Sequence, residues 1–387
     1  SYLLIIHTKK KNLYSMNKHK ILYVFGPGRK TKLINNSYKA KEFFYGYLYF
    51  KKNYKSEIIE VIKEEVNKKG LRKLIHFYDR LIVKLTNFPS YSVELITKKN
   101  IKEYKKFDFT VFTSDALFLS FLPIALINKI LRKKNKNIVI TMGLFGKTSS
   151  NQIKKIFNFI YLRLILFSAD KFALLGYGEY KFVKTNFKRY SNKFEYLPFC
   201  IDEAFWSKFN EYDKDGVLFV GNDGKRDYEL LKKIVKEMKE INFTVITNHD
   251  LNIQAENLNL IKGDWSKQLI TDEGLRDYFA KSKVTIIPLK ESFQPSGQSV
   301  ALQSISCNTP VLVSKTNGFW GNEEFINKLK IEFVEENNIE EWKSKINETL
   351  NKDKNSQLTK DTLSDFYKDY DIESFNTGLE KIILSYD

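Results

Sequence analysis

The sequence predicts an α/β protein built from two doubly wound domains in series. Short apolar runs alternate with longer amphipathic segments along the chain, which is typical of parallel strands connected by helices. A length of 387 residues suits two domains of ordinary size. The charge also changes sign near the middle, because residues 1–199 carry 40 Lys and Arg against 13 Asp and Glu, whereas residues 200–387 carry 24 against 33. We therefore expect the two halves to meet different partners.

In the first half, each predicted strand is a short apolar run that ends near glycine or a polar residue. The expected strands are Ile21–Phe25, Phe109–Thr113, Asn137–Thr141, Lys171–Leu175 and Phe194–Leu197, and the expected helices are Ala40–Lys55, Ala116–Ile127 and Ile153–Ser168. Ser114 can cap the helix that follows it. Ala116–Ile127 (ALFLSFLPIALI) is about a dozen residues long and contains a proline, so it predicts a buried core helix rather than a membrane span.

The boundary between the halves is predicted at Leu197–Asp215, where Pro198 precedes polar and aromatic residues. Beyond it, the expected strands are Gly216–Val220, Phe243–Thr247, Leu258–Ile261, Val284–Pro288 and Pro310–Ser314, and the expected helices are Glu229–Glu240, Gly274–Ser282, Gln298–Cys307, Ile339–Lys352 and Asp371–Tyr386. Two such domains in series place the carboxyl ends of their strands across a shared cleft. Open α/β sheets bind their ligands at those ends.

The cysteine content does not favour metal chemistry. Cys200 and Cys307 have no second cysteine or histidine at ligand spacing. We expect both to be buried, reduced thiols of a cytosolic protein. The apolar run Ser1–His7 is too short for a signal peptide and is followed by lysines, which reverses the usual order. The sequence therefore predicts a cytoplasmic protein without a metal site.

The segment Leu289–Ser314 (LKESFQPSGQSVALQSISCNTPVLVS) carries the clearest signal of a binding site. Ser296, Gly297, Gln298 and Ser299 open a predicted helix directly after a buried strand and a loop. A helix N-terminus presents unpaired N–H groups and a positive dipole end, and glycine lets an anion approach the backbone. The two serines add hydroxyl donors. A diphosphate site is one interpretation, and an ordinary strand–loop–helix unit with a capping serine is the other.

Gln303 lies one turn beyond Ser299 on the same predicted helix face, from which it can reach a ribose hydroxyl. The larger segment Tyr278–Ser314 resembles the donor-binding region of retaining GT-B glycosyltransferases, glycosyltransferase family 4 and its relatives. Those proteins carry Glu-x7-Glu leading into a helix and then Gly-Thr-Pro-Val, and Cys307–Val311 (CNTPV) matches the last part. The family's second Glu, which holds the donor ribose, falls on Gln303. Its first falls on Pro295, so the resemblance leaves the sugar-side role to the nearby Glu291 or Lys290.

A second stretch, Val217–Asp227 (VLFVGNDGKRD), resembles the first strand and glycine turn of the family's donor domain. In that turn Gly221 and Asn222 come first, and the cations Lys225 and Arg226 are the candidates for contact with the diphosphate. Arg226 is favoured because a guanidinium can bind phosphate oxygens bidentately. A solvated charged turn is the alternative interpretation of this stretch.

Weaker matches complete the resemblance. Gly263-Asp264-Trp265 is similar to the turn that faces the donor base, so Asp264 and Trp265 are predicted there. Gly26-Pro27-Gly28 is similar to the glycine loop of the acceptor-side domain, which makes Gly26 and Gly28 acceptor-side candidates. Met142 and Gly143 stand where the family often has a histidine, and they are predicted to lie on the acceptor side as well.

The resemblance implies a GT-B fold, in which two Rossmann-like domains face a central cleft. Residues 18–198 form the acceptor domain, 213–370 the donor domain, and 371–387 a helix that packs back on the first domain. The expected donor is a nucleoside-diphosphate sugar, with UDP favoured, and no further cofactor or metal is expected. Transfer proceeds with retention in this family, the leaving phosphate oxygen takes the acceptor proton, and Arg226 and Glu291 are the predicted catalytic residues.

The basic first half favours an anionic partner. Phe43–Lys55 and Ile153–Phe167 mix aromatic residues with lysines, so each can form a helix that lies in a membrane interface. A helix with an ordinary core stripe and a solvated basic face gives the same pattern. Nucleic acid is not the expected partner, because the sequence contains no RNP-like strand, helix-turn-helix or zinc finger.

These observations predict a hexosyltransferase at the inner face of the cell membrane. We expect it to be a peripheral protein that glycosylates a lipid or lipid-linked glycan, as in glycolipid and cell-envelope biosynthesis. Two alternatives stay open. One is a basic protein that binds nucleic acid or a membrane surface without catalysis, and the other is a GT-B sugar-nucleotide epimerase, which needs no acceptor.

Overall fold

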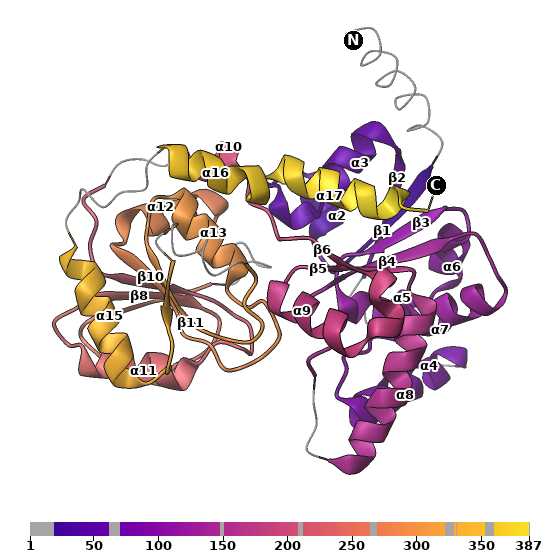
Figure 1. Ribbon diagram of the computed structural model, residues 1–387, viewed down its shortest axis with the longest axis horizontal. Coiled ribbons are helices and arrows are strands. Elements are labelled where there is room, and N and C mark those ends of the chain that lie inside the picture. The colour runs from indigo at the N-terminus through magenta and orange to yellow at the C-terminus, as the bar shows by residue number, and fades with distance from the viewer. Residues whose placement is uncertain are drawn as a thin grey trace, which may run out of the picture.

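The computed structural model describes residues 19–61, 70–147, 151–207, 212–263, 269–321, 329, 331–352 and 360–386. These residues form two six-stranded sheets with helices packed against them (Figure 1). The strand orders are β2-β1-β3-β4-β5-β6 and β12-β11-β10-β7-β8-β9, and neighbouring strands run parallel. The predicted class, two doubly wound α/β units, is confirmed.

The first sheet follows the predicted strands closely. Its strands are β1 (Lys20–Phe25), β2 (Lys55–Glu60), β3 (Phe109–Phe112), β4 (Lys136–Thr141), β5 (Lys171–Leu174) and β6 (Phe194–Tyr196). The helices around it are α2 (Arg29–Ile34), α3 (Tyr47–Asn53), α4 (Leu71–Thr86), α5 (Ser92–Leu95), α6 (Lys98–Tyr104), α7 (Asp115–Ile130), α8 (Gln152–Ser168) and α9 (Tyr177–Asn186), with short 3-10 helices η1 (Glu42–Phe44) and η2 (Lys188–Lys193). Helix α7 is a core helix as predicted, since most of its apolar side chains are buried. No helix in the described ranges is long and apolar enough to cross a membrane.

The prediction of a single helix over Ala40–Lys55 is wrong. The structure breaks this segment at Tyr45 and Gly46, whose φ angles of 47° and 81° are left-handed, and it then enters strand β2, which the sequence did not indicate. Because Tyr47 and Phe50 of α3 are buried in the core, the aromatic face of this segment is not free to enter a membrane.

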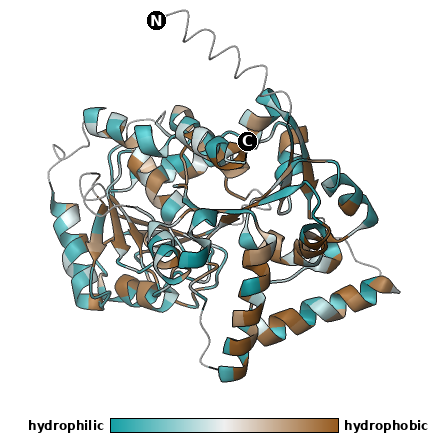
Figure 2. Cartoon of the chain, turned by 45° about the vertical axis from the view of Figure 1, so that its right-hand side comes forward, coloured by the Kyte–Doolittle hydropathy of each residue, from teal (hydrophilic) through white to brown (hydrophobic). Residues whose placement is uncertain are grey.

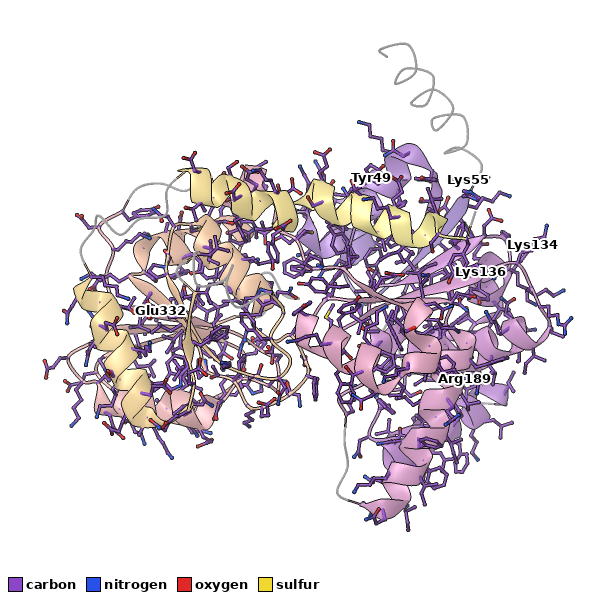
Figure 3. All side chains as sticks on the ribbon, in the orientation of Figure 1. Tyr49, Lys55, Lys134, Lys136, Arg189 and Glu332 are labelled. Atoms are coloured by element: carbon purple, nitrogen blue, oxygen red, sulfur yellow. The ribbon has the colours of Figure 1, made fainter. Side chains whose placement is uncertain are left out.

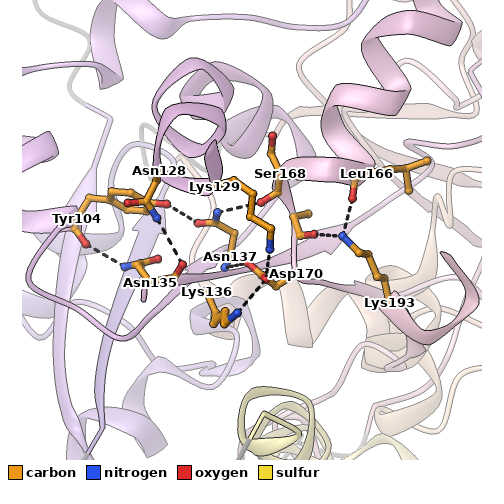
Figure 4. A network of polar contacts seen from close by, with 11 residues as sticks. Tyr104, Asn128, Lys129, Asn135, Lys136, Asn137, Leu166, Ser168, Asp170 and Lys193 are labelled. Atoms are coloured by element: carbon orange, nitrogen blue, oxygen red, sulfur yellow. Dashed lines mark hydrogen bonds and ion pairs between the residues drawn. The ribbon is translucent and has the colours of Figure 1, made fainter. Parts of the chain in front are cut away.

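A buried polar network holds the strand ends that lie away from the cleft (Figure 4). Asp170 accepts hydrogen bonds from Lys129 Nζ at 2.5 Å and from the backbone N–H of Asn137 at 3.0 Å, and Lys136 Nζ lies 3.6 Å from it. Lys193 donates to two backbone carbonyls nearby, and burial lowers the pKa of its ammonium to about 8. These contacts tie α7, the start of β4 and the segment before β5 together, and they stabilise the sheet at the amino ends of these strands.

The second sheet begins after the short helix α10 (Glu203–Trp206). Its strands are β7 (Val217–Val220), β8 (Phe243–Thr247), β9 (Leu258–Lys262), β10 (Val284–Ile287), β11 (Val311–Ser314) and β12 (Ile331–Val334), and the helices that follow in the chain are α11 (Tyr228–Glu237), α12 (Asp272–Lys281), α13 (Gln298–Ser306), α15 (Ile339–Asn351), α16 (Lys360–Tyr370) and α17 (Ile372–Leu384). Asn308 has a φ of 55°, so α13 ends at a left-handed residue. Strand β12 was not predicted.

The last helix, α17, lies on the first domain (Figure 1). Its Glu380 accepts hydrogen bonds of 2.8 Å from the hydroxyls of Tyr49 and Tyr54. One apolar core includes residues from both sheets and from α16 and α17. The chain therefore crosses between the two domains twice, and the two are joined by a shared core.

Candidate functional site

The turn between β10 and α13 is shaped around Gly297. This residue is the N-cap of α13, its φ of 83° is left-handed, and no side chain caps the helix. A Cβ atom there would lie 2.6 Å from Ile287 Cγ2 and 2.7 Å from Arg226 Nη1. A side chain here would displace Ile287 or Arg226, so the position favours glycine. The turn is buried, and the N–H groups and dipole at the start of α13 favour an anion beside it.

Arg226 enters the same turn from the loop after β7. Its side chain is only 3% exposed, Nη1 donates to Ser296 Oγ at 3.3 Å, and Nε lies 3.5 Å from Asp223 Oδ2 without forming a hydrogen bond. Burial lowers the pKa of Arg226, but a guanidinium remains protonated in proteins. A buried cation with one partly exposed carboxylate beside it attracts a further anion. Arg226, Ser296 and Gly297 are the residues that we call the cradle.

Gly221 and Asn222 position the cradle rather than line it. A Cβ atom on Gly221 would collide with the side chain of Arg226, so this glycine makes room for the guanidinium. Asn222 donates to Gly263 O at 2.6 Å and accepts from the backbone of Asn248 at 2.6 Å. It thereby ties together the carboxyl ends of β7, β8 and β9. Lys225 is half-buried, and its backbone oxygen accepts from the N–H of Lys290.

The two glutamines of α13 reach the first domain. Gln298 donates to Leu175 O at 3.2 Å, and Gln303 donates to Glu42 Oε1 at 3.3 Å. Both side chains are buried, whereas Ser299 is partly exposed at the helix start. The predicted contact of Gln303 with a ribose stays a prediction, since its amide is bonded to Glu42 in this structure. Asp264 and Trp265 lie outside the described residues.

Glu42 is a buried carboxyl that sequence reasoning missed. Its Oε1 also accepts from Trp206 Nε1 at 2.8 Å, while Oε2 has no hydrogen-bond partner among the described residues. Burial raises the pKa of Glu42 to about 7, even though the hydrogen bonds from Trp206 and Gln303 oppose the rise. The partners of Glu42 are far away in the sequence, so no local pattern marks it.

This carboxyl makes stability depend on pH. Glu42 holds its proton more tightly in the folded protein, with a pKa of about 7 against an ordinary value of 4.5, so its contribution to stability is complete below about pH 4.5 and is lost as the pH rises through 7. The difference corresponds to roughly 3 kcal/mol. We expect urea unfolding to show a loss of stability between pH 5 and pH 8 that Glu42→Gln reduces. Equal slopes for the two proteins would contradict the role of Glu42.

Glu179 holds the predicted acceptor-side loop after β4. Its carboxylate accepts from the backbone N–H of Gly143 at 2.8 Å and of Phe145 at 2.9 Å, and burial raises its pKa to about 7. Gly143 has a φ of 89°, and Met142 packs against the shared core. The other glycines predicted on the acceptor side, Gly26 and Gly28, face open space, since a Cβ atom on either would meet nothing within 4 Å.

The loop from Ser292 to Pro295 lies at the contact between the two domains, which we call the seam. A Cβ atom on Gly143 would lie 2.7 Å from Gln294 Cα, and one on Gly176 would lie 3.2 Å from Pro295. The ring of Phe293 lies 4.6 Å from that of Phe182 on α9. Glycines on the first domain therefore let this loop pack against it closely.

Beside this loop lies a cavity of about 840 Å³, which we call the seam cavity. It is lined by α9 and by the loops after β10 and β11, and its charged residues include Lys181, Lys315 and Glu291. Glu291 accepts from the backbone N–H of Asn317 at 3.0 Å. The two predicted catalytic residues therefore lie at two different sites: Arg226 belongs to the cradle, and Glu291 lines the seam cavity.

No protein-family model matches the sequence, and no curated protein matches it either. Solved structures do match. They include a glycosyltransferase from Rickettsia africae (15% identity, TM-score 0.60, 96% of this chain and 100% of that one) and an α,α-trehalose 6-phosphate synthase from Burkholderia multivorans (8%, 0.62, 95% and 97%). A third is a trehalose-6-phosphate protein from E. coli bound with UDP-2-fluoro glucose (10%, 0.62, 94% and 99%). This likeness shows the fold, and the predicted GT-B architecture is confirmed.

Proposed function

We propose that this protein is a glycosyltransferase that uses a nucleoside-diphosphate sugar, with UDP favoured. The observation that carries the proposal is the cradle, in which the buried Arg226 faces the uncapped start of α13 across Gly297. The cradle lies where β10 and β7 are neighbours and the strand order reverses. Ligands of open α/β sheets bind at such a switch point. The fold shared with an E. coli protein bound with UDP-2-fluoro glucose supports the same conclusion.

The chemistry follows from where charge develops during transfer. As the sugar leaves, negative charge grows on the diphosphate, and the dipole of α13 together with Arg226 stabilises it. No metal is required in this scheme, because these groups supply the positive charge. Retention, as in the family that the sequence resembles, lets the leaving phosphate oxygen take the acceptor proton. We assign to Glu291, at the seam cavity, a contact with the sugar or the acceptor.

The acceptor that we propose is a lipid or lipid-linked glycan at the inner face of the cell membrane. The support is the excess of positive charge in the first half and the exposed apolar side chains of α8. Such a surface suits a protein that rests on an anionic bilayer. The protein then acts in the synthesis of glycolipids or of the cell envelope.

Binding of the donor can be tested on the purified protein. We expect UDP and UDP-sugars to raise the melting temperature saturably, and we expect a UDP-sugar to release UDP only when a membrane lipid extract is present. Conversion of the UDP-sugar without an acceptor would indicate an epimerase instead. No response to any UDP or GDP compound, with a gel shift on RNA that survives about 0.3 M salt, would overturn the proposal in favour of nucleic-acid binding.

A further inference from the structure

Helices α4 and α8 contact each other at an angle in the first domain, and both carry apolar residues on exposed surface (Figure 2). Their contact includes the hydroxyls of Tyr78 and Tyr161, 3.4 Å apart. The face consists of Leu74, Phe77 and Leu81 on α4 and Ile156, Ile160 and Leu164 on α8, which are 37% to 66% exposed. The spacing within each helix is that of a stripe which normally faces a core. Here both stripes face outward, which indicates a surface that binds something apolar.

The charge of the two helices restricts what can cover this face. Together they carry seven Lys and Arg and a single acidic residue, Asp79. Asp79 is buried and accepts from the backbone N–H groups of Ser92 and Val93, so it does not balance the cations at the surface. If a second copy of the chain covered this face, its seven positive charges would lie against seven more, and the two copies would repel each other. An anionic bilayer matches both the apolar stripe and the cations.

A cavity of about 420 Å³ adjoins α8 on the side of η2, and we call it the basic cavity. Its apolar wall is formed by Leu162, Leu166, Phe187 and Tyr190. It also includes Phe159, which is itself 60% exposed on α8. The cavity is thus open to the same surface as the apolar face and is apolar within.

Three cations line the basic cavity. They are Arg163, Lys188 and Arg189, all exposed, and Figure 3 labels Arg189 beside α8. The guanidinium of Arg163 lies over the ring of Phe159 at 4.4 Å. Within the described ranges no carboxylate pairs with any of the three. An apolar cavity with unpaired cations at its edge fits an amphiphile whose head is a phosphate.

The basic cavity and the seam cavity are neighbours. Thr185 and Asn186, in the last turn of α9, line both of them. These two residues therefore lie between Arg163 and Arg189 on one side and Lys181 and Glu291 on the other.

We propose that the basic cavity binds the anionic headgroup of a membrane lipid while the α4/α8 face rests on the bilayer. The cations hold the phosphate, the apolar wall holds the first part of the lipid, and the polar end of the headgroup points toward the seam cavity. That this lipid is the sugar acceptor rests on the proposed function. The binding of the headgroup does not rest on it.

The test compares two double variants that remove the same charge. Arg163→Gln/Arg189→Gln changes the basic cavity, and Lys51→Gln/Lys52→Gln changes exposed lysines of α3, at the opposite end of the first domain in Figure 1. With phosphatidylcholine vesicles that contain phosphatidylglycerol, the cavity variant should bind about 30-fold more weakly than the parent protein. The α3 variant should change by less than about 2-fold, because α3 lies at the other end of the first domain from α4 and α8 and salt screens its charges from the bilayer. Equal losses in the two variants would overturn the cavity as the headgroup site.

A soluble probe separates the cavity from the apolar face. Short-chain dihexanoyl-phosphatidylglycerol below its micelle concentration should bind to the parent protein and to Leu74→Ser/Phe77→Ser, but not to the cavity variant. Inorganic phosphate at the same concentration should not displace it, since the apolar wall contributes to binding. Displacement by phosphate, or RNA binding that survives about 0.3 M salt, would overturn the lipid assignment. If UDP fails to stabilise the protein while the lipid still binds, the proposed function fails and the headgroup site stands.

Discussion

Replacing Gly297 with valine should reduce the affinity for UDP and UDP-sugars by at least about 100-fold, which corresponds to the loss of one or two charge-assisted hydrogen bonds to the diphosphate. The reason lies in the backbone and in the space around it. A φ of 83° is costly for a β-branched residue. A Cβ atom would also lie 2.7 Å from Arg226 Nη1, so the guanidinium must move out of the cradle. Isothermal titration calorimetry with UDP measures the change.

Strain alone must be separated from blockage of the site. Gly70, before α4, also has a positive φ of 57°, but a Cβ atom there would meet nothing within 4 Å. Gly70→Val should therefore lower the melting temperature without lowering the affinity of the protein for UDP. A folded Gly297→Val protein, with unchanged circular dichroism and parental affinity for UDP, would show that the diphosphate does not bind at the start of α13.

Much of the fold was predictable, because buried parallel strands are short apolar runs whose neighbours in sequence are helices. Strand β2 was missed because it is an edge strand with a polar sequence, KSEIIE. Helix α4 carried a visible signal, since Leu74, Phe77 and Leu81 recur at helical spacing. Its stripe would have been taken for a core face, and only the structure shows that it is exposed.

The candidate site was predictable where it depends on local backbone. The turn at Gly297 and the loop with Arg226 are each set by a few consecutive residues, so their roles can be inferred from the sequence. The partners of Gln298 and Gln303 were not predictable, because Leu175 and Glu42 reach them only when the two domains pack together. Glu179 was missed for the same reason, since its ligands are backbone N–H groups of a loop in another part of the chain.

These long-range contacts connect the cradle to the seam. Helix α13 presents its first turn to Arg226, and its glutamine side chains bond to the first domain. The loop before it packs on first-domain glycines. The position of the cradle therefore depends on contacts with both domains, and changes at the seam, such as Glu42→Gln, should be examined for effects on donor affinity as well as on stability.

Replacing Arg226 with alanine should weaken UDP binding by about 1.5–3 kcal/mol, or roughly 10- to 150-fold, which is the scale of a hydrogen bond to a charged group. The guanidinium is buried, and its Nε, 3.5 Å from Asp223 Oδ2, forms no hydrogen bond with the described residues. A diphosphate oxygen would supply the acceptor that Nε lacks. Arg226→Lys should give an intermediate loss, because it keeps the charge but not the planar fork. The decisive comparison is with uridine, which has no phosphate. If Arg226 contacts the diphosphate, the alanine variant binds uridine as the parent does, whereas equal losses for UDP and uridine would show that Arg226 acts only through the fold of the turn.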